Sequence, residues 1–187
     1  MIWLVLGVML FCGVHLIPSL APSLRAAWYG RLGENGYKGG FSLLVLAALA
    51  LIVIGWRSAQ PTMIYQPLPA LHHAGISLLQ LAFLLLVVST RPSRLRLVIR
   101  HPQLTGVLLW GIAHLLLNGD SRSLILFGGL SCWALVAMIA INHRDGTWVK
   151  AAPPTWAAEI VTLLITAVVI TVIVVIHPWI SGMPVRY

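Results

Sequence analysis

Long apolar runs dominate this sequence. A transmembrane helix needs about 20 mostly apolar residues to cross about 30 Å of hydrocarbon, and six such runs are separated by charged residues, proline or glycine. The chain is 59% hydrophobic and 9% charged, whereas soluble domains carry about 25% charged residues. The pattern predicts an all-α integral membrane bundle of about six transmembrane helices, forming a single domain over residues 1–187. The predicted spans are 2–24, 40–56, 70–90, 102–117, 121–142 and 155–180.

The first run has neither a basic segment before it nor a small-x-small cleavage site, so we expect it to persist as a helix. The positive charges then indicate which side of the membrane each loop faces. Under the positive-inside rule, the loops at 25–39, 91–101 and 143–154 are cytoplasmic and both termini lie outside. The formal net charge of +8 is thereby explained by topology, so the expected partner is the lipid bilayer and not nucleic acid. The cytoplasmic set is Arg25, Arg31, Lys38, Arg91, Arg94, Arg96, Arg100, Arg144 and Lys150, against Arg57, Arg122 and Arg186.

Two of the seven histidines lie well inside predicted spans. His15 precedes Pro18, which lacks a backbone N–H, so we expect a kink where the imidazole projects. In the fourth span Trp110, His114 and Asn118 follow each other at intervals of four and share one face of the helix. Ionisable groups inside a bilayer usually face a partner or a cavity. His15 and His114 are therefore candidates for a ligand or metal site, or else they hydrogen-bond across helices and hold the bundle together.

At the start of the fourth span, Arg100 and His101 precede Pro102, which suits the first helical position. A guanidinium beside an uncapped helix N-terminus favours an anion such as a lipid phosphate, a cofactor phosphate or a carboxylate. About 20 Å of helix separates His101 from His114, so these two side chains cannot bind the same metal. Glu159 is the only acidic residue inside a predicted span, and carboxylate-based acid–base catalysis is therefore not expected.

Other polar residues near the span ends have structural interpretations. Residues 118–121 form a tight turn in which Asp120 or Ser121 caps the next helix. The last span closes with His177, Pro178 and Trp179, and the tryptophan at that depth is an interfacial anchor. The remaining candidates are His72, His73 and His143, interpreted as interfacial, and Cys12 and Cys132, interpreted as buried packing residues.

Taken together, the motifs resemble the NnrU family of bacterial membrane proteins over nearly the whole chain. That family is related to the plant 15-cis-zeta-carotene isomerase, in which two histidines ligate haem b. The resemblance implies that His15 and His114 are haem b ligands. Gly111 stands where the isomerase has a cysteine as an alternative ligand, so a thiolate-to-histidine exchange is not implied. The matching segments are 15–19, 32–38, 100–104 with Gly106, 110–120 with Leu126 and Phe127, and 177–179 with Gly182 and Pro184.

The resemblance further implies the bacterial inner membrane, a link to nitrogen-oxide metabolism in denitrifying organisms, and other membrane or respiratory proteins as partners. Under the haem hypothesis Asn118 would orient one ring, and Arg100 with His101 would hold the propionates. Counting both spans from their first residues puts the two intramembrane histidines about 12 Å apart in depth. Starting both spans one turn later reduces this offset to a few Å.

Two alternatives stay open. An Arg-His-Pro sequence followed by glycine is similar to a motif of isoprenylcysteine methyltransferases and some membrane sterol reductases, where it helps to bind an anionic cofactor. Those enzymes also use a polar, glutamate-bearing C-terminal segment, whereas this chain ends at Tyr187 just after its last span. The other alternative is a non-enzymatic membrane subunit or assembly factor. The sequence alone leaves open whether the protein is an enzyme.

Overall fold

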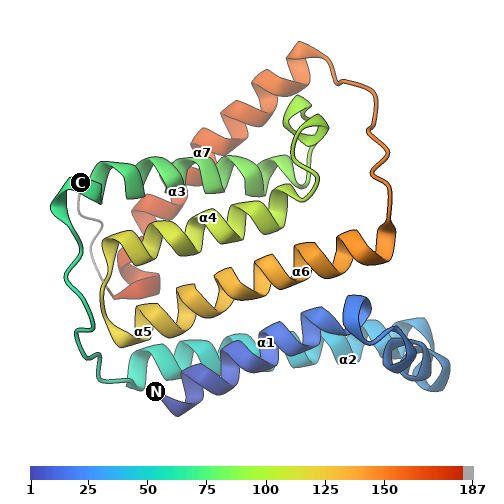
Figure 1. The fold of residues 1–187 in the computed structure, drawn as a ribbon, viewed down its shortest axis with the longest axis horizontal. Helices are drawn as coiled ribbons and strands as arrows, with labels where there is room; N and C mark the ends of the chain where they lie inside the picture. The colour runs from blue at the N-terminus through green and yellow to red at the C-terminus, as the bar shows by residue number, and fades with distance from the viewer. Residues whose placement is uncertain (183–187) are drawn as a thin grey trace.

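The computed structural model describes residues 1–182, and 81% of these residues are helical. Within these residues the β-structure is limited to one isolated bridge between Met63 and Asp120. The prediction of an all-helical chain is confirmed. The elements, labelled in Figure 1, are α1 (Ile2–Leu20), α2 (Pro22–Ser58), η1 (Pro69–Leu71), α3 (His72–Val88), η2 (Arg94–Leu97), α4 (Pro102–Leu117), α5 (Ser121–Ser123), the π-helical turn η3 (Leu124–Gly128), α6 (Gly129–Asp145) and α7 (Trp156–Ser181).

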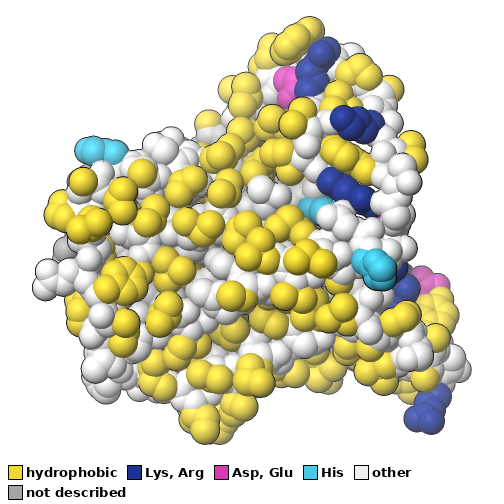
Figure 2. All heavy atoms as spheres, viewed as in Figure 1, with side chains coloured by type: hydrophobic (Ala, Val, Ile, Leu, Met, Phe, Trp, Pro, Cys, Tyr) yellow, Lys and Arg dark blue, Asp and Glu magenta, His cyan; other side chains and the backbone are white. Residues whose placement is uncertain are grey.

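Among residues 1–182, five helical segments are long and apolar enough to cross a membrane: Ile2–Leu20, Pro22–Ser58, Pro69–Val88, Ser121–Asp145 and Trp156–Ser181. Helix α4 is apolar too, but it has 16 residues. Hydrophobic side chains cover most of the face shown in Figure 2, and Lys and Arg gather at the right-hand end. In Figure 1 that end carries the connections from α3 to α4 and from α6 to α7. An apolar outer surface with a basic end is typical of a protein whose solvent is lipid.

The expected loop at 25–39 is wrong: this segment is helical and belongs to α2. Ala21 ends α1 early because a residue before proline disfavours helical backbone angles, and Pro22 then begins α2 at its first position. Inside α2 the helix breaks at Gly33, which has φ of 68° and ψ of −178°. Polar residues end a membrane span, but they do not end a helix. On the turn after Gly33, Glu34 and Lys38 form an ion pair of 2.6 Å at the four-residue spacing that stabilises helices.

The helices pack as two antiparallel hairpins with α6 between them. Helix α1 packs along α2, α3 packs along α4, and α6 contacts both α1 and α4, while α7 rests on α3 (Figure 1). Glycines permit the closest crossing: a Cβ at Gly7 would lie 2.7 Å from the backbone nitrogen of Ile52, and a Cβ at Gly55 would collide with the backbone of Leu4. Small residues at such crossings let backbones approach and gain dispersion contacts.

Candidate functional site

His15 lies half-buried among aromatic rings of α1, α2 and α6. Its ring centroid is 4.1 Å from that of Phe11, 5.4 Å from that of Phe41 and 5.5 Å from that of Trp133. Its Nδ1 is 2.8 Å from the carbonyl oxygen of Phe11. A carbonyl only accepts hydrogen bonds, so a singly protonated ring carries its proton on Nδ1 and its lone pair on Nε2.

His114 in α4 repeats this local geometry. Its Nδ1 is 2.9 Å from the carbonyl oxygen of Trp110, so its Nε2 likewise keeps the lone pair. Phe127 stacks on the imidazole with the centroids 4.2 Å apart and an interplanar angle of 22°, and the Trp110 ring lies 4.8 Å away. Phe127 belongs to the π-helical turn η3, a feature that often occurs at functional sites.

The two intramembrane histidines lie at different heights along the bundle. The ring of His15 contacts Trp133, and the ring of His114 contacts Phe127. Both aromatic residues belong to the continuous helical segment Ser121–Asp145, where six residues correspond to about 9 Å of axial rise. The two imidazoles therefore contact this segment about 9 Å apart along its axis.

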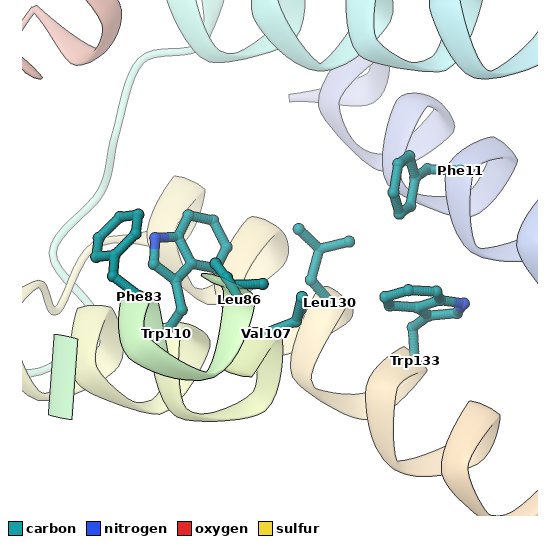
Figure 3. Close-up of a pocket in the computed structure, with 7 residues that line it drawn as sticks. All are labelled: Phe11, Phe83, Leu86, Val107, Trp110, Leu130 and Trp133. Carbon is teal, nitrogen blue, oxygen red and sulfur yellow. The ribbon is translucent and has the colours of Figure 1, made fainter. Parts of the chain in front are cut away.

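An apolar cavity of about 240 Å³ lies between the two aromatic groups. In Figure 3, Phe11 and Trp133 lie on one side of the cavity, and Phe83 and Trp110 on the other. Phe11 and Trp133 also contact His15, and Trp110 also contacts His114. The cavity therefore separates the two histidines. Its lining is Phe11, Phe83, Leu86, Val107, Trp110, Leu130 and Trp133, without a charged residue.

A third histidine, His177 in α7, lies at the same end of the bundle as His114. Ser181, one turn beyond His177, places its hydroxyl 3.2 Å from Nδ1 of His177, and its carbonyl accepts a 3.3 Å hydrogen bond from Nε1 of Trp56. Trp56 in turn meets the edge of Phe127, with centroids 6.0 Å apart.

Asn118 hydrogen-bonds to the backbone of His114 and not to its ring. The amide Nδ2 of Asn118 donates to the carbonyl oxygen of His114 at 2.9 Å, and the hydroxyl of Tyr65 donates to the carbonyl of Asn118 at 2.9 Å. Burial, together with the charge of Asp120, raises the pKa of Tyr65, so the phenol stays a donor at neutral pH. A Cβ at Gly119 would collide with the carbonyl of Tyr65, so only glycine permits this approach.

Asp120 and Arg122 form a polar cluster beside this end of α4. Burial opposes ionisation of Asp120, yet hydrogen bonds from Ser123 and from the backbone of Arg122, with the Arg122 charge, lower its pKa overall. The Arg122 guanidinium lies 4.6 Å above the Trp56 ring and donates to the Trp56 carbonyl at 3.2 Å. Its Nε is buried and 3.7 Å from Asp120, without a hydrogen-bond partner. The Nε–H of Arg122 is therefore a positively charged donor without a hydrogen-bond acceptor.

Arg100 and His101 lie at the opposite end of α4, about 20 Å of helix away from His114. Arg100 donates to the carbonyl of Gly146 at 2.8 Å, and Nε2 of His101 lies 2.8 Å from Oδ1 of Asn142. These contacts tie the start of α4 to the end of α6. The structure therefore does not place Arg100 and His101 beside the His114 ring.

Gly111 is buried where α4 crosses α6. A Cβ at this position would lie 2.7 Å from the carbonyl oxygen of Phe127 and would collide with the Ser131 hydroxyl. No side chain fits there without moving one helix. Gly111 is therefore a packing requirement of this chain.

Comparison with known proteins gives one positive result. No curated protein and no solved structure matches the sequence. The family model described as NnrU protein matches residues 3–185, nearly the whole chain, and the protein therefore belongs to the NnrU family.

Proposed function

We propose that this NnrU protein is a six-span inner-membrane protein, with both termini outside, that binds haem b through intramembrane histidines and takes part in nitrogen-oxide metabolism or another haem-dependent reaction. The observation that carries the proposal is the repeated hydrogen bond from Nδ1 of His15 and His114 to a carbonyl one turn earlier. Metal-ligating histidines usually donate their other ring N–H in this manner, and the bond orients the ring for Nε2 to bind.

The same observation argues against the interpretation that the two histidines only hold the bundle together by hydrogen bonds between helices. Both hydrogen bonds stay within the histidine's own helix, to Phe11 and to Trp110. In residues 1–182 neither imidazole hydrogen-bonds to another helix, which is what an interhelical role would require.

The donor set at the His114 end suits haem. Haem brings four donor atoms of its own, so one or two imidazoles complete its coordination, and the bound iron supplies one-electron chemistry and binding of small diatomic ligands. In the part of the chain that the structure describes, no group of three or more His, Cys, Asp or Glu side chains is arranged to hold a metal ion. Nε of Arg122, which is 3.7 Å from Asp120 but has no hydrogen-bond partner, offers a charged donor for a propionate carboxylate near this end.

The proposal is tested by absorption spectroscopy of protein purified in mild detergent from cells supplied with a haem precursor. We expect a Soret band and resolved α and β bands after dithionite, and their loss in His114→Ala. His73→Ala is the matched control, because His73 is an exposed histidine at the start of α3. A well-folded but colourless wild-type protein would overturn the proposal.

A further inference from the structure

We propose that the connection between α3 and α4, together with the start of α7, binds an anionic diacyl phospholipid. The phosphate lies on the guanidinium groups of Arg91, Arg94 and Arg96, and one acyl chain lies along α7. This site is at the basic end of the molecule, where Figure 2 shows Lys and Arg side chains beside the apolar surface. The inference does not depend on the proposed haem function, because it uses none of the histidines.

The three arginines of this connection carry more charge than the protein neutralises. Among residues 1–182, none of their guanidinium groups forms an ion pair with a carboxylate. Glu159 lies against the connection, but its oxygens accept from two neutral donors, the Ser93 hydroxyl at 3.0 Å and the Arg94 backbone N–H at 2.5 Å. The Nε of Arg91 is buried and has no hydrogen-bond partner. A charge in that position is costly unless an anion lies nearby, so a bound phosphate stabilises this connection.

The connection is held in a fixed position against α7. The hydroxyl of Ser93 accepts from the backbone N–H of Leu95 at 3.2 Å and donates to Glu159 in the first turn of α7. The Arg94 guanidinium lies 4.3 Å from the centroid of the Trp156 ring. Such a contact uses the flat face of a guanidinium and leaves its N–H groups at the edge, where they match phosphate oxygens in pairs. The donors are thus positioned before a ligand arrives, which lowers the cost of binding.

An exposed apolar stripe leads from this charged group along α7. Trp156, Ile160, Leu163 and Leu164 follow at helical spacing, share one face and are 56–69% exposed. The stripe starts at the ring that contacts Arg94 and extends about 12 Å along the helix axis. Helix α7 is long and apolar enough to cross a membrane, so the stripe continues into the hydrocarbon. A phospholipid contacts both the arginines and the stripe, whereas a soluble anion contacts only the arginines.

The test uses the full chain in phosphatidylcholine vesicles that contain a small share of lipid with brominated acyl chains, which quench tryptophan fluorescence on contact. The quenching of Trp156 is the difference between each protein and its Trp156→Phe counterpart. We expect brominated phosphatidylglycerol, which is anionic, to quench Trp156 more strongly than brominated phosphatidylcholine at equal mole fraction.

This preference for phosphatidylglycerol should fall about fivefold in Arg94→Gln, since one basic residue at a membrane surface contributes about that factor. It should fall less in Arg94→Lys, which keeps the charge but not the flat guanidinium. Arg57→Gln is the matched control and should leave the preference unchanged, because Arg57 is an exposed arginine in the last turn of α2.

Equal quenching by the two lipids overturns the inference, and so does an unchanged preference in Arg94→Gln. Loss of the preference when inorganic phosphate is added at constant ionic strength also overturns it, because the site would then take a soluble anion. Size-exclusion chromatography shows whether each variant is folded. If Arg94→Gln does not fold, Arg96→Gln decides by the same criterion.

Discussion

The close crossing of α4 and α6 at Gly111 allows us to predict how much a larger residue there lowers the stability of the fold. Gly111→Ala places a Cβ 2.7 Å from the carbonyl oxygen of Phe127, where ordinary contacts begin at 3.4 Å. The helices have to separate or a side chain has to leave its rotamer, and overpacking of this kind costs about 1–3 kcal/mol. Replacing glycine by alanine inside a helix contributes about 1 kcal/mol in the opposite direction.

Gly13→Ala is the matched control, because nothing lies within 4 Å of a Cβ at Gly13 and this position also lies inside a helix. Both variants share the gain in helix propensity, so the difference between them isolates the crowding at Gly111. We expect Gly111→Ala to be less stable than Gly13→Ala by about 1–3 kcal/mol, which corresponds to about 2–12 °C in Tm.

The measurement is thermal unfolding in one detergent, followed by tryptophan fluorescence. The fluorescence of Trp110 and Trp133 reports on the packing of this crossing, since both residues line the cavity beside it. Equal Tm values for Gly111→Ala and Gly13→Ala would refute the reasoning, because they would mean that α4 and α6 do not approach as closely as the structure shows.

Three further substitutions test other parts of the fold. Gly33→Ala is expected to lower the stability by about 1–3 kcal/mol, because the φ of 68° with ψ of −178° at this position suits glycine alone. Thermal unfolding measures this loss, and Gly30→Ala is the control that should cause no loss of stability. Glu159→Ala removes the acceptor of hydrogen bonds from Ser93 (3.0 Å) and the Arg94 backbone (2.5 Å), so tryptic cleavage in the α3–α4 connection should become faster, and an unchanged rate would contradict this role. Asp120→Ala should cost about 1 kcal/mol at neutral pH through loss of the cap. Because the folded-state pKa of Asp120 lies below its ordinary value of 3.8, this contribution is complete above that pH and is lost as the pH falls through the folded-state pKa; a gap between variant and wild type that stays constant through acid titration would argue against it.

Much of the secondary structure could be predicted because apolarity and helical spacing are local properties. Trp110 and His114 share a face in the structure, as their four-residue spacing predicts, and their rings lie 4.8 Å apart. The segment 25–39 was mispredicted because apolar length identifies the part of a helix that lies in lipid, whereas α2 continues through polar residues beyond it.

The candidate site depends on relations between helices, and these are only partly accessible from sequence. The interpretation of residues 177–179 as the end of a span, with Trp179 as its interfacial anchor, rested on their place near the end of an apolar run. The contact of Ser181 with Trp56, from α7 to α2, joins residues 125 positions apart. No local pattern encodes such a contact, because it depends on how two separately formed helices pack.

The sequence by itself determined that this protein is helical, apolar on its outside and a member of the NnrU family, because composition, periodicity and motif spacing are read along one chain. It also identified His114 as an ionisable residue inside a membrane span, where such residues usually face a partner or a cavity. The tertiary structure decided which aromatic rings surround each imidazole. Relative heights of helices follow from side-chain packing at crossings such as that of Gly111 with Phe127, and that packing places His15 beyond the cavity and brings α7 to the end where His114 lies.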